Sequence, residues 1–318
     1  MLHVGGEQEL AQMNYFRELT NSGRSSLRWI IESAQLKHKR LLLPDFLCEV
    51  ILDVLAEYHI NVDFYTVDRQ FGYQLPDDLS HYDGLYLIKY FGAVTDSFER
   101  ALSTFKQCII VDDVFSPYPH VLDLAQPWYS FNSLRKISPI ADFSMLYSNR
   151  TFATVKVDKL PEFAELKYQA KQCKYDYFNS GVGSEKAFLA LFAQGERCLD
   201  EKKGIFSPSN RSVLESLDFY RQLDQEKILR RKNYNVICSE LAEYLSPITT
   251  DYYSFAVIFL PDRDVIRKKL MAHNIFLAVH WPEVIGISNQ LSRAILSIPL
   301  DSRYSKKNME DICQYVLN

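Results

Sequence analysis

The stretch Ser130-Phe131-Asn132-Ser133-Leu134-Arg135-Lys136-Ile137-Ser138-Pro139 places a lysine in a β-rich part of the sequence. We expect this part of the chain to be enclosed by the fold. Burial disfavours the charged form of a lysine, so an enclosed amine loses its proton more readily, as imine formation with an aldehyde requires. A lysine alone carries no functional signal, and the sequence around this one must decide its meaning.

Helical segments and short apolar runs alternate from about Arg24 to Val157. Helices are expected over Ser25–Ser33 and over about Phe46–Tyr58. Strands separated by helices of this length indicate parallel βαβ crossovers, hence a sheet covered on both faces. The predicted strands are Leu41–Leu43, Val62–Val67, Leu85–Tyr90, Cys108–Val111, Phe143–Tyr147 and Phe152–Val157. This part of the chain is therefore predicted to be α/β.

The pattern changes after about Leu160. Long amphipathic segments follow, and Ser212–Leu245 is expected to be helical over much of its length. The remaining predicted elements are a strand over Tyr252–Leu260, a helix over Asp262–His273 capped by Asp262, a strand over Ile295–Ile298 and a helix over Lys306–Val316. We therefore predict a large domain over residues 1–200 and a small α+β domain over residues 201–318, with a linking helix from about residue 212.

The composition is that of a globular protein. Of 318 residues, 47% are hydrophobic and 24% charged, and the formal net charge of -4 comes without a long Lys/Arg block. Neither nucleic acid nor an anionic membrane is therefore expected as a partner. The six cysteines are scattered without metal-binding spacing, which predicts reduced thiols and no metal site. Met1–Glu7 does not read as a signal peptide and no apolar run has the length of a membrane span, so a cytoplasmic location is expected.

A small polar turn, Asn21-Ser22-Gly23-Arg24-Ser25-Ser26-Leu27, leads directly into the first predicted helix. Free amides at a helix N-terminus, together with serine hydroxyls, can bind a phosphate group. The segment on its own is also explained by an ordinary serine N-cap.

A second candidate is Cys108-Ile109-Ile110-Val111-Asp112-Asp113-Val114, in which a buried strand ends in two carboxylates. Open α/β sheets bind ligands at this carboxyl edge. A carboxylate there could pair with the protonated pyridine nitrogen of a cofactor. Neighbouring residues of a strand point to opposite faces, so only one of Asp112 and Asp113 is expected to face the site. Metal binding or helix capping would explain the pair equally well.

The third candidate, Val279-His280-Trp281-Pro282, follows a short predicted strand in the C-terminal part. Its histidine and aromatic ring could close over a substrate. A hydrogen-bonded His–Trp pair in the core is an equally good explanation of the same residues.

Taken in order, these segments resemble the DegT/StrS nucleotide-sugar aminotransferases, which are fold-type I enzymes that use pyridoxal 5'-phosphate (PLP). Family members read roughly N-S-G-T-x-A-L, V-P-x-F/Y, I-E-D-A-A-Q and S-F-x-x-x-K-N-L-x-x-G-E-G-G. The similar segments here are Asn21–Leu27, Leu43–Phe46, Val111–Ser116 and Phe131–Ser144. Arg230–Tyr234, His280–Pro282 and Leu296–Tyr304 are similar to the R-R-x-N-Y, H-W-P and L-P-x-D-x-R-Y patterns of a divergent branch.

The resemblance implies an aspartate-aminotransferase-like fold, with a mostly parallel sheet of the seven-stranded type in the large domain. It implies that Lys136 forms the internal aldimine with PLP and moves protons, and that Asp113 holds the pyridine nitrogen. The remaining implied cofactor contacts are Gly23, Arg24, Ser25, Ser26, Cys48, Ser116, Ser130 and Ser133. On the substrate side we expect His280, Trp281, Tyr90 and Asn210, the last reaching the partner's site in a homodimer.

The reaction that the resemblance implies moves an amino group from an amino acid such as glutamate to a nucleotide-linked keto-sugar, as in surface polysaccharide biosynthesis. The chain departs from the family where Ser116 replaces the usual Gln, Cys48 the stacking aromatic residue and Arg24 a Thr. A PLP lyase or dehydratase and a catalytically silent scaffold therefore remain alternatives. A doubly wound nucleotide-binding domain is disfavoured, because the sequence contains neither G-x-G-x-x-G nor a Walker turn.

Overall fold

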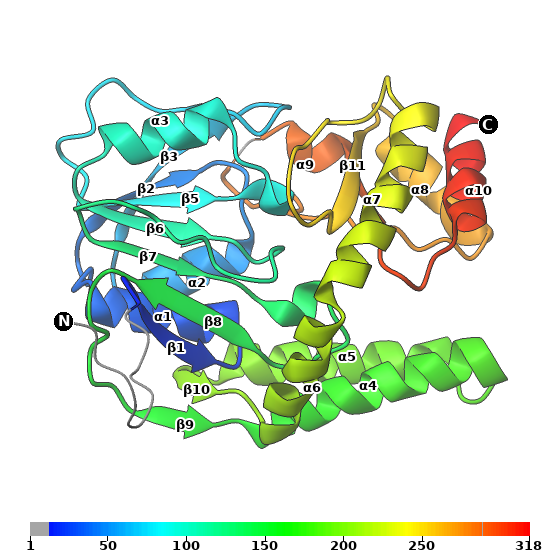
Figure 1. The fold of residues 1–318 in the computed structure, drawn as a ribbon, viewed down its shortest axis with the longest axis horizontal. Coiled ribbons are helices and arrows are strands. Elements are labelled where there is room, and N and C mark those ends of the chain that lie inside the picture. Colours follow the sequence, from blue (N-terminus) through cyan, green and yellow to red (C-terminus); the bar gives the residue numbers. More distant parts are fainter. Residues whose placement is uncertain (1–12, 288) are drawn as a thin grey trace, which may run out of the picture.

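The structure is a computed structural model, and it describes residues 13–287 and 289–318. The segment Met1–Glu7, which bears on the signal-peptide prediction, lies outside the described residues. Within them an eight-stranded sheet has the order β1-β8-β7-β6-β5-β2-β3-β4 (Figure 1). Its strands are β1 (Phe16–Thr20), β2 (Arg40–Pro44), β3 (Asn61–Val67), β4 (Tyr73–Gln74), β5 (Gly84–Ile88), β6 (Cys108–Asp112), β7 (Trp128–Phe131) and β8 (Ser144–Ser148).

The sheet is mostly parallel, as predicted. Only β8 runs against its neighbours β7 and β1, and the two-residue strand β4 is antiparallel to β3. The central strands β2, β5 and β6 are nearly continuous apolar runs, because a parallel sheet is covered on both faces. Apart from β4, the sheet has the seven strands of the predicted type.

Three helices accompany these strands: α1 (Gly23–Ser33), α2 (Glu49–Glu57) and α3 (Asp96–Thr104). The α1 helix begins where the Ser22 side chain accepts a hydrogen bond from the Ser25 amide, which is the usual serine N-cap. Its apolar residues Leu27, Ile30 and Ile31 are buried, and the helix packs on β7 and β8. This packing holds the N-terminus of α1 near the carboxyl end of β7.

A helical hairpin extends from this sheet domain (Figure 1). It consists of α4 (Pro161–Ser180) and α5 (Glu185–Glu201), which pack along each other. Gly181 ends α4 in the left-handed conformation, with φ of 66°, and Ser184 caps α5. Two short strands at the base of the hairpin, β9 (Val157–Lys159) and β10 (Ile205–Ser207), pair in parallel.

The C-terminal part contains a separate antiparallel pair of strands. Its elements are α6 (Asn210–Arg221), α7 (Leu223–Glu240), β11 (Phe255–Phe259), α8 (Arg263–Ala272), α9 (Leu291–Ala294), β12 (Ile295–Pro299) and α10 (Lys306–Leu317). The helix α7 packs against β11 and α10, and lies between the sheet domain and the C-terminal helices in Figure 1. The predicted division at residue 200 falls within the last turn of α5.

Several predicted elements differ from the structure. The segment Phe152–Val157 is not a strand except at its last residue, and the helix predicted over Ser212–Leu245 is two helices that meet at Gln222. Asp262 stands at the N-cap of α8, but its side chain makes no capping hydrogen bond. The elements β1, β7 and α3 were not predicted from the sequence. Among the described residues, no helix is both long and apolar enough to cross a membrane.

Candidate functional site

Lys136 ends a short 3₁₀ turn (Leu134–Lys136) that directly follows β7. Its amide donates to the Ser133 carbonyl at 3.0 Å, which fixes the turn. The side chain is exposed, so the enclosed setting expected from the sequence is not found for Lys136 itself. The positive charge of Arg135, followed by loss of hydration, lowers the pKa of Lys136 to about 8. An appreciable fraction of this amine is therefore uncharged near neutral pH.

Asp112 ends β6, beside the end of β7 from which the chain continues into the lysine turn. It is paired in register with Phe131 of β7, whose ring lies against Gly23 at the start of α1. Tyr86 donates to Asp112 Oδ2 at 2.8 Å, and the Val114 amide donates to Oδ1 at 3.2 Å. Burial raises the pKa of Asp112 to about 7, although the Tyr86 hydrogen bond and the charge of Lys136 oppose this. The carboxylate is therefore costly to charge unless a cation pairs with it.

Asp113, the carboxylate expected to hold the pyridine nitrogen, lies in a different environment. It is completely buried, with Lys89 Nζ 3.2 Å from Oδ2 and the Ser116 hydroxyl donating to Oδ1. Ser130 of β7 is paired in register with Val111, and its hydroxyl donates to the His120 carbonyl at 2.6 Å. The structure thus brings Asp113 and Ser116 together, but with Lys89 rather than with Lys136.

The polar turn before α1 contains several donors without acceptors. No acceptor is found among the described residues for the Gly23 and Arg24 amides or for Asn21 Nδ2, which is buried. The Ser133 hydroxyl is also buried and unpaired within the described part of the chain. A Cβ at Gly23 would lie 3.1 Å from the Phe131 ring, so this position favours glycine. The N-terminus of α1 can therefore receive an anion.

The other predicted phosphate ligands are occupied by structural contacts. Ser25 Oγ donates to Asn21 Oδ1 at 2.8 Å and accepts from the Phe206 amide at 3.3 Å. Ser26 Oγ is 2.7 Å from both Thr20 Oγ1 and Ser144 Oγ. These two hydroxyls hold α1 against β1, β8 and β10.

Arg24 and Arg135 both pair with acidic residues of α5. Arg24 lies 2.7 Å from Asp200 and 3.5 Å from Glu196, while Arg135 lies 2.8 Å from Glu196. Cys48, at the N-cap of α2, is half-buried, and its electrostatic interaction with Lys136 raises the pKa of the lysine. The charged surroundings of Lys136 therefore come from α1, α2 and α5.

The predicted substrate residues separate into two groups. Trp281 and Tyr90 are buried and in edge-to-face contact, and the Tyr90 hydroxyl donates to the Phe46 carbonyl, so both belong to the aromatic core. His280 Nδ1 is 2.8 Å from Ser297 Oγ. Burial, with a smaller contribution from the charge of Lys136, lowers the pKa of His280 to about 3, so this imidazole is neutral and near the lysine.

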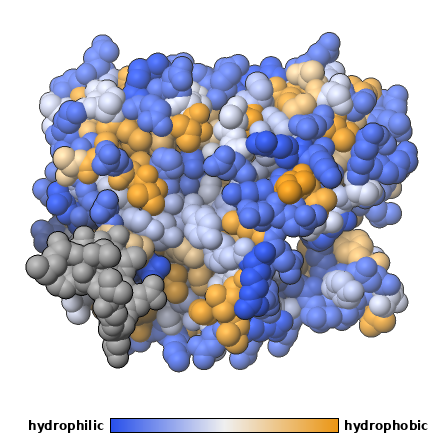
Figure 2. Space-filling view, viewed as in Figure 1, coloured by the Kyte–Doolittle hydropathy of each residue, from blue (hydrophilic) through white to orange (hydrophobic). Residues whose placement is uncertain are grey.

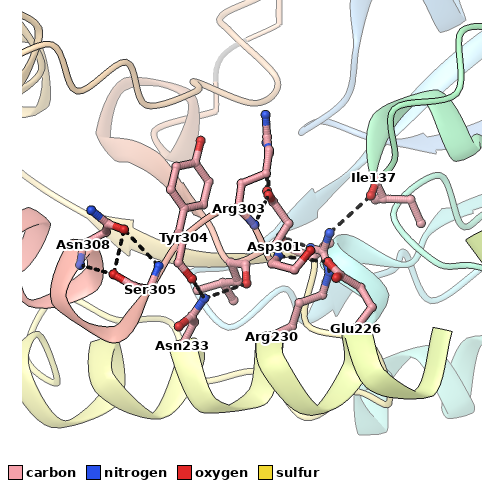
Figure 3. Close-up of polar contacts among 12 residues, drawn as sticks. Ile137, Glu226, Arg230, Asn233, Asp301, Arg303, Tyr304, Ser305 and Asn308 are labelled. Atoms are coloured by element: carbon pink, nitrogen blue, oxygen red, sulfur yellow. Dashed lines mark hydrogen bonds and ion pairs between the residues drawn. The ribbon is translucent and has the colours of Figure 1, made fainter. Parts of the chain in front are cut away.

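Two C-terminal motifs meet beside the lysine turn (Figure 3). Arg230 of α7 donates to the Ile137 carbonyl at 3.2 Å and to the Ser254 carbonyl at 3.0 Å, and it pairs with Glu226 at 2.8 Å. Asn233, one turn later, donates to the carbonyls of Leu300 and Tyr304, each at 3.0 Å. Arg230–Tyr234 and Leu296–Tyr304 thus attach the C-terminal part to the backbone next to Lys136.

Asn210, the first residue of α6, is exposed. Leu214 and Leu217 follow it at helical spacing and are 65% and 50% exposed. In Figure 2, apolar surface interrupts the polar surface in the region of α6. Within the described residues, no cluster of three or more His, Cys, Asp or Glu side chains could hold a metal ion.

Comparison with known proteins gives a result only at the level of structure. No family model and no curated protein sequence matches the chain. A DegT/DnrJ/EryC1/StrS aminotransferase from Brucella abortus is 12% identical, with a TM-score of 0.63, over 95% of this chain and 85% of that one. The chain has the fold of these aminotransferases. The predicted fold is thereby confirmed.

Two further structures share this aminotransferase fold. DesI, solved in the presence of its TDP-sugar product, is 12% identical with a TM-score of 0.63, over 94% of this chain and 79% of that one. NtdA from Bacillus subtilis, solved with bound cofactor PMP, is 13% identical with a TM-score of 0.61, over 95% of this chain and 74% of that one. At these identities the aminotransferase fold is shared, and the chemistry has to be argued from the residues of this chain.

Three residues near the lysine turn were given no role in the sequence-based predictions. Asp112 was recognised as one of a pair but not chosen, and Arg135 adjoins the lysine in the stretch quoted first. Glu196 had no local signal, because only the packing of α5 brings it to the site. The sequence therefore predicted several of the segments that meet around the lysine turn, but not every side chain there.

Proposed function

We propose that the chain binds PLP between the N-terminus of α1 and Lys136 and acts as an aminotransferase. The observation that carries this proposal is the convergence of three groups at the carboxyl ends of β6 and β7. They are the weakly basic amine of Lys136, the buried carboxylate of Asp112 and the open helix N-terminus at Gly23. The shared fold and the PMP bound to NtdA support the choice of cofactor.

The unpaired donors fit the phosphate group of this cofactor. The Gly23 and Arg24 amides, Asn21 Nδ2 and the Ser133 hydroxyl would bind its oxygens, each gaining the partner it lacks among the described residues. Ser25 and Ser26 would act indirectly by fixing the helix on which these amides lie. The positive end of the α1 dipole would add to the attraction.

Asp112, in place of Asp113, would hold the protonated ring nitrogen. Asp113 is already paired with Lys89, whereas Asp112 is influenced by the charge of Lys136 and lacks a cation at hydrogen-bond distance among the described residues. When bound, the cofactor supplies an aldehyde and an electron-withdrawing ring. Lys136 would provide the attacking amine and then act as the base that moves a proton from the substrate carbon. Its pKa of about 8 suits both tasks.

We propose an amino acid such as glutamate as donor and a keto-sugar, nucleotide-linked, as acceptor. The support is the TDP-sugar product present with DesI, a protein of the same fold. His280 is the best-placed of the predicted substrate residues, because it is neutral and close to Lys136. A role in polysaccharide biosynthesis and a cytoplasmic location remain predictions.

We also propose a homodimer formed through the exposed face of α6. Leu214 and Leu217 would be covered in it, and Asn210 would lie at the edge of the partner's site. Exposed leucines at helical spacing are more typical of an interface than of a solvated helix face.

The first test is the visible spectrum of the purified protein mixed with PLP. A band that depends on Lys136 is expected, and glutamate is expected to shift it toward the amine form of the cofactor. Lys136→Ala should remove the band, while Lys156→Ala, at an exposed lysine, should retain it.

The result separates the alternatives. Absence of any lysine-dependent band would favour the catalytically silent scaffold. A lysine-dependent band that glutamate leaves unchanged would instead favour a lyase or dehydratase.

A further inference from the structure

The strand β8 has one face that is turned away from α1. Ser144 Oγ lies 2.7 Å from Ser26 Oγ of α1, so this side of the strand faces the helix. Side chains alternate along a strand, so Met145 and Tyr147 point to the opposite face. There the ring of Tyr147 lies against that of Tyr15, with 4.6 Å between the two centroids. This face of the sheet edge, which β1 and β8 form in Figure 1, therefore carries aromatic side chains.

A second pair of tyrosines borders the same surface. The rings of Tyr118 and Tyr220 are stacked, with centroids 4.7 Å apart and planes inclined by 19°. Met145 joins the two pairs, because the hydroxyls of Tyr147 and Tyr220 lie 3.5 Å and 3.8 Å from its Sδ. The Tyr220 hydroxyl also donates to the Pro117 carbonyl at 2.8 Å, which fixes this ring. Tyr118 is 47% exposed, so a second planar ring can stack on the side that Tyr220 does not cover.

A cation lies beside these rings. Arg17 of β1 is opposite Tyr147 in the antiparallel ladder, and Leu19 is opposite Met145. Directly opposite residues point to the same face, with their Cβ atoms about 5 Å apart. Arg17 is exposed, and no carboxylate in the described part of the chain forms an ion pair with it. Its guanidinium is therefore available to pair with a phosphate group next to the aromatic rings.

We propose that this surface, formed by Tyr15, Arg17, Tyr118, Tyr147 and Tyr220, binds a nucleotide. The base stacks on the open side of Tyr118, and a phosphate group pairs with Arg17. Stacking accepts any base, so no strong base preference is expected. An apolar peptide would use the rings alone, whereas a planar ring that carries a phosphate uses both the rings and the cation. The surface takes no group from the lysine turn or from the N-terminus of α1, so it is separate from the proposed cofactor site.

The test is a calorimetric titration of the purified protein with adenosine diphosphate (ADP), without PLP. Wild type should bind ADP more tightly than ribose phosphate, which lacks the base, and more tightly than adenosine, which lacks the phosphate. Tyr118→Ala should weaken ADP binding about 5- to 100-fold, the usual effect of losing one stacked base. Tyr118→Phe keeps the ring and should bind ADP within about twofold of wild type. Arg17→Gln should weaken the binding of ADP but not that of adenosine.

Tyr175→Ala, at an exposed tyrosine of α4, is the matched control and should bind ADP like wild type. The proposal is overturned if wild type does not bind ADP at millimolar concentration, if ribose phosphate binds equally well, or if Tyr118→Phe loses as much affinity as Tyr118→Ala. It is also overturned if Tyr118→Ala changes the mass of the protein in solution but not its affinity for ADP, because the surface would then be an interface between copies of the chain. ADP binding without a lysine-dependent band with PLP would sink the proposed function and leave this inference standing. The band without ADP binding would do the reverse.

Discussion

At the scale of single residues, two adjacent aspartates end β6 in opposite environments. Asp113 is held by Lys89 and Ser116, while Asp112 is paired in register with Phe131 and accepts a hydrogen bond from Tyr86. Alternation along a strand predicts that the two point to opposite faces and that only one of them faces the site, and their partners in the structure do differ. Which one does so depends on the register of β6 with β7, and β7 was not recognised in the sequence.

Asp112→Asn is expected to change how the stability of the cofactor-free protein depends on pH. The folded-state pKa of about 7 lies above the usual 3.8, so between these values the folded protein binds the proton and the unfolded chain does not. Stability from this group is therefore lost as pH rises through about 7. Between about pH 5 and pH 8, the free energy of unfolding of the wild type should fall relative to that of the variant by roughly 1–3 kcal/mol. Urea unfolding of both proteins at the two pH values measures this difference.

The same variant should bind PLP about ten- to a hundred-fold more weakly, the cost of one charged hydrogen bond. Asp77→Asn, at an exposed aspartate, is the control for both measurements. If Asp113→Asn weakened PLP binding and Asp112→Asn did not, Asp113 would be the ring partner, as the family resemblance implied.

At the scale of elements, the sequence predicted best where apolar runs are continuous. The strands β2, β5 and β6 were located because buried parallel strands combine β-branched or leucine-rich runs with flanking turns. The strand β7 has only four residues, and β1 precedes the region in which strands were expected. Short strands of this kind are defined by their neighbours in the sheet and not by their own pattern.

The segment Phe152–Val157 shows why pattern alone can mislead. Its apolar, β-prone residues predict a strand, but Trp29 Nε1 donates to the Ala153 carbonyl at 2.9 Å and the Ala153 amide donates to Ser33 Oγ at 3.0 Å. Side chains of α1 thus occupy the backbone groups that a neighbouring strand would need.

Arg230→Met is expected to destabilise the protein by about 3 kcal/mol. The substitution keeps the apolar stem in α7, but removes the bonds to Ile137 and Ser254 and leaves Glu226 without its cation. The free energy of unfolding in urea measures this loss.

Arg231→Met, at the exposed neighbouring position, is the matched control and should cost less than about 1 kcal/mol. Equal losses in the two variants would mean that α7 as a whole, and not the contact to the lysine turn, is responsible.

At the scale of the whole molecule, the sheet domain and the C-terminal part share a continuous core. Phe91 and Phe115 of the sheet domain form edge-to-face ring pairs with Phe255 and Trp281 of the C-terminal part. The predicted division into residues 1–200 and 201–318 stays a prediction. Long-range packing of this kind is invisible in a single sequence, because its partners are more than a hundred residues apart.

Leu214→Glu combined with Leu217→Glu is expected to convert a dimer into a monomer, since two charges would be buried in the α6 interface. Light scattering coupled to size-exclusion chromatography measures the mass directly. Leu189→Glu changes an equally exposed leucine of α5 and should leave the mass unchanged. A wild-type protein that stays monomeric at all concentrations would contradict the proposed dimer.

The position of Glu196 along the chain has a consequence for the order in which the protein is made. The cations Arg24, Arg135 and Lys167 all leave the ribosome before the carboxylate that gathers them. A nascent chain that has completed all eight strands of the large sheet therefore still carries an excess of positive charge beside its lysine. These cations can pair with Glu196 only after α5 has been synthesised and has packed against the turn. The smallest folding unit that contains the complete surroundings of the lysine therefore includes the hairpin as well as the sheet.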